Sequence, residues 1–149
     1  MDTLLTTIVL WLSINFQLPA NYEHPEVKFA TPHEITQMRY GRPIQSSVEN
    51  DGTNAVDPFT VVAVYNRKTH TVYLPSGWTG QTPGESSALV HEMVHHLLTL
   101  SGAKFACPEE EEKLAYEAQE EWLGLMGRSL KSEFDLDPFT VKVLTTCIY

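Results

Sequence analysis

The chain has 149 residues, a length typical of one domain built around one hydrophobic core. Hydrophobic residues make up 42% of it and charged residues 19%, which excludes disordered, collagen-like and membrane-bundle proteins. Nineteen acidic against ten basic residues give a formal charge of −9, which repels nucleic-acid phosphates and anionic lipid. We therefore expect a single domain over residues 1–149 that binds no nucleic acid, and composition leaves its oligomeric state open.

Residues 1–18 form a mostly apolar run with polar breaks, among them Thr6, Ser13 and Asn15. The run is too short and too polar for a stable membrane span, which needs about 20 apolar residues. We favour a first helix packed on the domain, which suits a cytoplasmic protein. The alternative is a signal segment, and the protein would then be secreted or periplasmic.

The next part of the chain has the signals of short strands and one short helix. Residues 27–30 predict a strand and residues 33–39 a helix, while the Ser-, Asn- and Gly-rich stretch 41–58 indicates a mobile loop. The β-branched and aromatic runs 59–65 and 70–74 are separated by four turn-compatible residues. Together these two runs predict a β-hairpin in a small antiparallel sheet.

Three further helices are predicted in the second half of the chain. Thr82 and Glu85 have capping-box spacing, and Gly102 closes the helix that they open. Proline at the first helical position also predicts helices over residues 108–127 and 139–147. The expected fold class is therefore α+β.

The two cysteines, Cys107 and Cys147, fit no zinc-ribbon or CxxC pattern. They could form a disulfide in an oxidising compartment or remain buried free thiols. The sequence leaves both alternatives open.

The stretch Ser86–Leu100 carries a chemical motif on its predicted helix. At about 100° per residue its apolar residues form a broad face, and His91 and His95 lie about 40° apart just beyond one edge of it. Two imidazoles one turn apart on a rigid helix can bind one tetrahedral metal ion. Glu92 is turned away from this pair, where it can reach a metal-bound water. The string "HEMVH" is thus the HExxH zinc motif, and Zn²⁺ is the expected cofactor.

The alternative for His91 and His95 is a structural role, solvated or hydrogen-bonded. A helix without a site would place Gln or Lys at the core margin, because burying unpaired imidazoles costs free energy. His96 follows the pair directly but lies about 100° from His95 and about 140° from His91. We expect His96 to be a surface residue or a hydrogen-bond partner near the site, and not a ligand.

A catalytic zinc site takes three protein ligands, so the third should come from another element. The next helix offers seven glutamates, four of which fall on its polar face: Glu110, Glu117, Glu120 and Glu121. Glu112 lies on the buried side, where a carboxylate needs a partner such as a metal. Glu109 and Glu111 are the alternatives. Negative charge at a helix N-terminus explains the run 109–112 without any metal.

The string "HEMVH" followed by a glutamate on the next helix resembles the gluzincins, the zincin metallopeptidases with a glutamate ligand. The downstream "EKLA" is similar to their ExxA segment, whose first glutamate binds the metal, and this again implies Glu112. The wider pattern, with "YLPSGW", "CPEEEEKLAYEAQ" and "DPFT", is similar to a family of small bacterial proteins of unknown function. That resemblance implies a minimal zincin-like core, with a strand hairpin and two metal-bearing helices.

The same resemblance implies a zinc metallopeptidase in which Glu92 takes a proton from a metal-activated water that attacks a carbonyl. A peptide or protein substrate would lie along an edge strand, for which residues 70–74 are the candidate. Fuller gluzincins add a Tyr or His that stabilises the oxyanion. We expect Tyr116 in this role, with Tyr73 and His70 behind it, and the alternative for Tyr116 is an ordinary core residue.

A second function class is a zinc-stabilised binding or interaction module, in which the ion is structural or the activity has been lost. Glu92 discriminates between the two, because a purely structural site has no use for an unliganded carboxylate beside the water position. We therefore favour the hydrolase. No feature of the sequence identifies a specificity pocket.

Overall fold

The structure is a computed structural model that describes residues 1–21, 23–40 and 62–148. It confirms the α+β class, since helices surround a small sheet in this part of the chain. In chain order the elements are α1 (Asp2–Phe16), β1 (Glu26–Ala30), α2 (Pro32–Tyr40), β2 (Val64–Asn66), β3 (Thr71–Pro75), α3 (Pro83–Ser101), α4 (Pro108–Gly124), α5 (Leu130–Phe134) and α6 (Pro138–Leu144).

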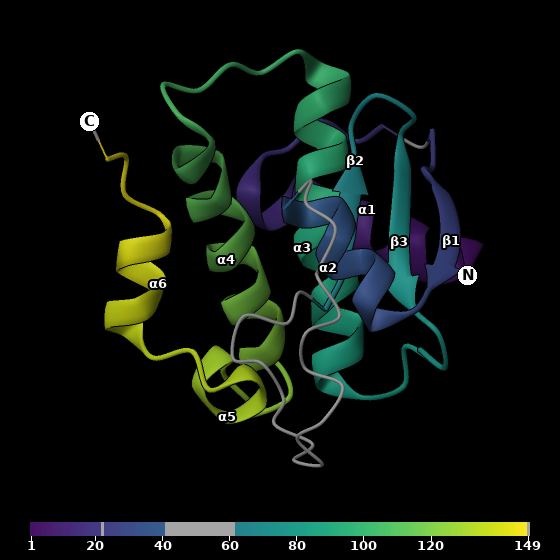
Figure 1. Ribbon diagram of the computed structural model, residues 1–149. Coiled ribbons are helices and arrows are strands. Elements are labelled where there is room, and N and C mark those ends of the chain that lie inside the picture. Colours follow the sequence, from purple (N-terminus) through teal and green to yellow (C-terminus); the bar gives the residue numbers. More distant parts are fainter. Residues whose placement is uncertain (22, 41–61, 149) are drawn as a thin grey trace.

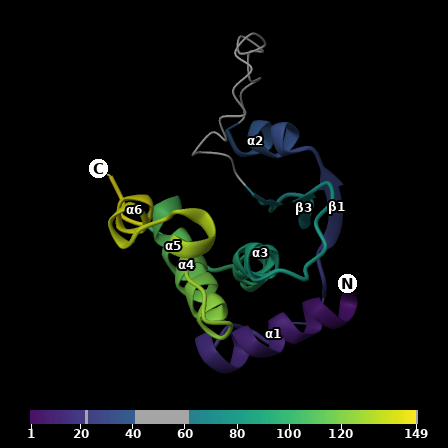
Figure 2. The same ribbon diagram turned by 90° about the horizontal axis from the view of Figure 1, so that it is seen from below.

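Helix α3 lies at the centre of the molecule (Figure 1). Seen nearly end-on in Figure 2, it has the sheet on one side, α4 on the other and α1 beneath, with α2 on the side opposite α1. Every residue from 86 to 98 is buried. A helix enclosed in this way has no solvent face, so each polar side chain on it must find its partner inside the protein.

The sheet has the order β1-β3-β2, and it is mixed where an antiparallel sheet was expected. The predicted hairpin is present as the antiparallel pair β2 and β3, but β1 joins β3 in parallel, with Val27 opposite Val72. Strand β3 is therefore central, and the expectation that residues 70–74 form an edge strand is wrong. Thr71, Val72 and Leu74 are all buried, a pattern typical of a strand covered on both faces.

The expected first helix is present as α1, and it packs on the core. Its buried side chains, none more than 1% exposed, are Leu5, Ile8, Val9 and Leu12. Trp11 on the same helix meets Trp122 of α4 edge to face, with ring centroids 5.2 Å apart. In the described ranges we find no helix with the length and apolarity that crossing a membrane requires.

Other boundaries differ from those expected. Helix α4 ends at Gly124 and α6 at Leu144, each before the predicted end, and α5 was not predicted. The expected mobile loop over residues 41–58 lies outside the described residues, as does the beginning of the run 59–65. The local patterns therefore located the helix starts better than their ends, because the starts carry capping residues.

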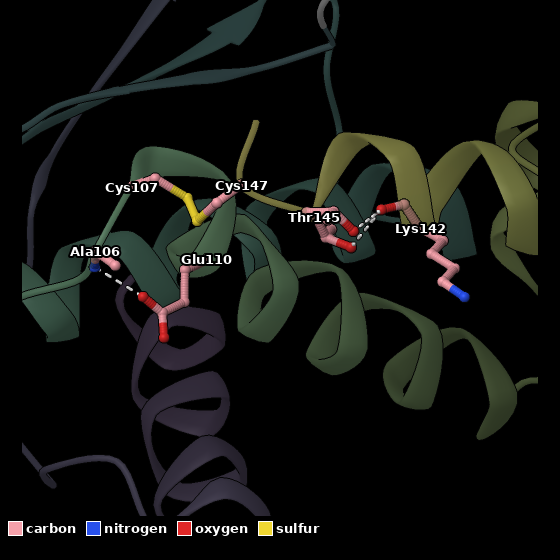
Figure 3. Close-up of a disulfide and its surroundings, with 7 residues drawn as sticks. Ala106, Cys107, Glu110, Lys142, Thr145 and Cys147 are labelled. Carbon is pink, nitrogen blue, oxygen red and sulfur yellow. Dashed lines mark hydrogen bonds between the residues drawn. A yellow bond between two sulfur atoms is a disulfide. The ribbon is translucent and has the colours of Figure 1, made fainter. Parts of the chain in front are cut away.

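Cys107 and Cys147 form a disulfide, which decides between the two alternatives for these residues (Figure 3). Cys107 is the N-cap of α4, and Cys147 lies in the segment after α6. None of the residues of α6 is buried. The disulfide therefore ties a surface helix to the start of the helix that carries Glu112.

Candidate metal centre

His91 and His95 lie one turn apart on α3, and their side chains are enclosed. Thr82 caps this helix by accepting a hydrogen bond from the backbone N–H of Glu85, and Gly102 ends it with φ of 71°. His91 is 8% exposed and His95 6%, and their ring centroids are 5.2 Å apart. The capped helix thus fixes the spacing of the two imidazoles before any ligand binds.

Helix α4 brings Glu112 to this pair, as the helical wheel predicted. Glu112 Oε2 lies 2.9 Å from His91 Nε2, and Glu112 Oε1 lies 2.9 Å from His95 Nε2. One ligand atom from each of the three residues falls within 4.8 Å of the others, and all three residues are buried. Two nitrogens and one carboxylate from adjacent helices therefore converge on one small volume.

A chain of hydrogen bonds fixes the orientation of His91. The Ser87 hydroxyl donates to the backbone oxygen of Gly84 at 2.8 Å, so it accepts from Gln119 Nε2 at 3.2 Å. Gln119 Oε1 is then turned to His91 Nδ1 at 2.9 Å and accepts its proton. Because a backbone carbonyl can only accept, the direction of every bond in the chain follows.

His95 is oriented by a carboxylate in the same way. Its Nδ1 lies 2.9 Å from Glu111 Oε1, and the other oxygen of Glu111 accepts from Arg67 Nη2 at 3.0 Å. An ionised carboxylate is an acceptor only, so Nδ1 of His95 carries a proton. Glu111, an alternative ligand in the sequence, thus contacts the opposite side of the imidazole from the converging atoms.

These contacts test whether the site suits a metal. With Nδ1 protonated in both rings, a neutral imidazole offers a lone pair on Nε2. The lone pairs of His91 and His95 then face the carboxylate of Glu112 at 2.9 Å, an arrangement that repels unless a cation lies between the atoms. That cation is either a proton or a metal ion.

The pKa values describe the protonated alternative. Burial disfavours the charged form of His95, but hydrogen bonds to Glu111 and Glu112 outweigh it and raise the pKa of His95 to about 10. Burial acts against ionisation of Glu112 too, yet hydrogen bonds from His91 and His95 hold the pKa of this carboxyl well below its ordinary range. Two imidazoles and one carboxylate are a ligand set that zinc prefers, so these residues fit a zinc ion that replaces the protons.

Glu92 lies beside the ligands without belonging to them. It is 8% exposed, and its carboxylate forms no hydrogen bond or ion pair with any residue that the structure describes. Its oxygens are not among the fully buried polar atoms that lack a partner, so they keep some contact with solvent, and its negative charge helps to raise the pKa of His95. A residue kept in such a position is available to a water or a substrate in the site.

The other predicted site residues are spread more widely. The ring of Tyr116 lies edge to face against that of His91, with centroids 4.6 Å apart, so the structure brings this tyrosine to the site. Tyr73 packs against the small apolar cluster of Ala30, Ile35 and Val64. His70 is exposed in the hairpin turn and lies 5.9 Å from the ring of His96. Of the three candidates for stabilising the oxyanion, Tyr116 is the one whose ring packs against a proposed metal ligand, His91.

His96 is buried at 1% exposure, so the expectation of a surface residue is wrong. Its Nε2 donates to the backbone oxygen of Glu23 at 2.7 Å, and its Nδ1 therefore accepts from the Tyr65 hydroxyl at 2.9 Å. Burial lowers the pKa of His96, in keeping with a neutral ring. It joins α3 to β2 and to the segment after α1, and it is not a ligand in this arrangement.

The sequence interpretation missed the partners that orient the ligands. Gln119 lies two helical turns after Glu112, hence on the same face of α4, and this spacing could have indicated it. Arg67 lies in the β2–β3 turn and meets Glu111 from a distant part of the chain. No local pattern could have paired Arg67 with α4.

The comparisons with known proteins bear on the whole chain and not on single residues. No curated protein and no solved structure matches it. A family model described as "Domain of unknown function (DUF6647)" matches residues 1–148, which include all the residues of the candidate metal centre. The chain therefore belongs to the DUF6647 family, whose function is unknown.

Proposed function

We propose that this protein is a zinc-dependent hydrolase, most simply a metallopeptidase of the gluzincin type. The observation that carries the proposal is the combination of a buried His91-His95-Glu112 triad with the neighbouring Glu92, which is 8% exposed and forms no hydrogen bond or ion pair with the described residues. A structural zinc site is usually closed by four protein ligands, whereas a catalytic site has three and leaves one position to water. The residues here match the second pattern.

Each residue has a defined part in this proposal. His91, His95 and Glu112 hold the zinc ion, which when bound would lower the pKa of a water and polarise a carbonyl. Gln119 and Glu111 keep both imidazoles in the tautomer that offers Nε2. Glu92 accepts the proton of the attacking water and later transfers it to the leaving amine.

The sheet offers a place for an extended peptide, although a different one from that expected. Because β3 is central, the two edges among the described strands are β1 and β2. Strand β2 ends at Asn66, directly before Arg67, and Arg67 contacts Glu111 next to the metal centre. We therefore place a peptide substrate along the edge of β2 if it binds by strand addition.

The second candidate function is a binding module with a structural zinc ion. It is favoured by the burial of all three ligands, none of which is more than 8% exposed. In that case Glu92 has no chemical role, and its replacement would leave every function of the protein unchanged.

Glu92→Gln tests the proposal, because it keeps the shape of the side chain and removes the base. We expect the variant to retain its zinc and to lose hydrolysis of a fluorogenic peptide library by at least 10²-fold, the range of general-base catalysis. Glu117→Gln, at an exposed position on α4, is the matched control. It should change neither the zinc content nor the rate of peptide hydrolysis. Equal activity of wild type and Glu92→Gln would rule out this hydrolase, and zinc without any hydrolysis in wild type would favour the binding module.

A further inference from the structure

We infer that Arg39 of α2 supplies the positive charge that stabilises the oxyanion formed at the scissile carbonyl. The inference rests on the proposed function and adds a catalytic residue to it. It identifies a charged donor beside the triad, whereas the sequence indicated Tyr116 first, with Tyr73 and His70 behind it.

The position of Arg39 supports this role. Helix α2 lies on the side of α3 opposite α1 (Figures 1 and 2), and Arg39 is in its last turn. Arg39 Nη2 lies 3.5 Å from Glu112 Oε1, the carboxylate oxygen that also faces His95. The side chain of Arg39 is 47% exposed and that of Glu112 only 10%. The guanidinium therefore lies at the boundary between the buried Glu112 carboxylate and solvent.

The bonding state of Arg39 leaves it available. A distance of 3.5 Å exceeds the usual range for a charge-assisted N–H···O bond, about 2.7–2.9 Å. Among the described residues Glu112 is its one ionic partner, and a guanidinium has five N–H donors. Arg67, by contrast, is engaged with Glu111 at 3.0 Å. Of the two arginines that the structure describes beside the triad, Arg39 is thus the one that can accept a new anionic partner.

The charges of the site lead to the same conclusion. Counted over the described residues, a bound zinc ion would be balanced by the two carboxylates of Glu92 and Glu112, and the pair Glu111–Arg67 is neutral. Arg39 then leaves one positive charge in excess, although the chain as a whole carries −9. An excess positive charge beside the reacting atoms stabilises a transition state that gains negative charge more than it stabilises the neutral substrate.

In the reaction, the oxygen of water forms a bond to the carbonyl carbon, and the π electrons of the C=O bond move to its oxygen. Glu92 takes the released proton. The oxyanion accepts hydrogen bonds from Arg39 until the C=O bond re-forms and the C–N bond breaks, and the amine leaves with the proton from Glu92. The products are a carboxylic acid and an amine, so no other reactant is needed.

Inorganic phosphate, a tetrahedral oxyanion, gives a test that does not depend on turnover. Its binding to the zinc-loaded protein is measured by calorimetry for wild type, Arg39→Ala, Arg39→Lys and the control Arg128→Ala, whose arginine pairs with Glu133. We expect Arg39→Ala to weaken phosphate binding at least tenfold, Arg39→Lys to weaken it less, and the control to bind as wild type does. Zinc content should be equal in all four proteins.

Peptide hydrolysis gives the second readout. Arg39→Ala should lower kcat by about 10²–10³-fold, the usual loss of one oxyanion donor, with little change in KM. The inference is overturned if Arg39→Ala binds phosphate and turns over peptide as wild type does. It is also overturned if only KM rises, and only for peptides with a free C-terminal carboxylate, because Arg39 would then recognise the substrate in its ground state. Absence of zinc or hydrolysis in wild type would instead refute the proposed function.

Discussion

Gln119 and Glu111 decide which nitrogen His91 and His95 would offer to a metal ion in the proposed centre. Each accepts the Nδ1 proton at 2.9 Å and so leaves Nε2 directed at the carboxylate of Glu112. Partners of this kind fix the orientation of a ligand and raise its basicity. We therefore expect the zinc affinity of the proposed centre to depend on residues that do not contact the ion.

Replacement of Gln119 by leucine should show this dependence. The change keeps most of the volume and removes the acceptor of the His91 proton, so we expect zinc affinity to fall about 10- to 100-fold. Competition with a fluorescent chelator measures the effect. Gln119→Glu keeps an acceptor oxygen and is the control. It should bind zinc more tightly than Gln119→Leu does. Equal affinities in wild type and Gln119→Leu would mean that the network does not orient His91.

The sequence predicts some of these residues and not others for a physical reason. His91, Glu92 and His95 are linked by the helical period alone, and Glu112 could be selected because α4 is also a regular helix. Arg39 and Arg67 come from α2 and from the hairpin turn. Their distance from the triad depends on how the helices and sheet pack, which no local spacing encodes.

At the scale of elements, the N-terminus of α3 is held by the loop before it. Glu85 Oε2 accepts hydrogen bonds from the backbone N–H and the hydroxyl of Thr79 and from the backbone N–H of Gly80, at 2.6–2.7 Å. The capping signature correctly predicted the bond from Glu85 N–H to Thr82. The reciprocal contact differs from a capping box, because the Glu85 carboxylate reaches back to the loop and not to Thr82.

These bonds predict a pH-dependent effect of Glu85→Gln. Hydrogen bonds from the hydroxyl and then the backbone of Thr79 lower the pKa of Glu85 below its ordinary 4.5. Its stabilisation is therefore present above pH 4.5 and is lost as the pH falls through the lower pKa of the folded protein. At pH 7 we expect Glu85→Gln to lower the free energy of unfolding by about 1 kcal/mol, a modest value because the side chain is partly exposed.

Urea unfolding of wild type and Glu85→Gln at pH 7 and pH 3 measures this difference. The two proteins should become more alike at pH 3. Glu117→Gln, whose carboxylate is exposed on α4, serves as the control for removing one negative charge. A difference that stays constant from pH 7 to pH 3 would contradict the assigned role of the Glu85 carboxylate.

At the scale of the whole molecule, the disulfide closes a long loop. Cys107 and Cys147 are 40 residues apart in sequence, and the loop between them contains α4, α5 and α6. Such a bond stabilises a protein mainly by restricting its unfolded state. It also fixes α6, which has no buried residue of its own.

Removal of this bond by Cys147→Ser should lower the free energy of unfolding by about 3 kcal/mol. For a chain of this size that corresponds to a decrease in Tm of roughly 10 °C. Differential scanning calorimetry compares the variant with wild type under oxidising and reducing conditions, and reduced wild type should match Cys147→Ser. Equal Tm values for oxidised wild type and the variant would show that the disulfide contributes little.

The order of the strands shows what a whole-molecule arrangement adds to local patterns. The hairpin of β2 and β3 was predictable because its strands are neighbours in sequence. The parallel pairing of β1 with β3 joins strands that are far apart in the chain, and it turned a supposed edge strand into the central one. The choice of β2 as the edge for the proposed peptide substrate therefore followed from the strand order and not from composition.

The central claim is that α3 and α4 jointly form one zinc site, and the zinc content of wild type beside Glu112→Ala tests it most directly. Mass spectrometry of the metals in purified proteins should find about one zinc ion per wild-type chain and none in Glu112→Ala. Glu109→Ala, in the same turn of α4, should retain the metal. Zinc that persists in Glu112→Ala, or a wild-type chain that binds none, would contradict the account.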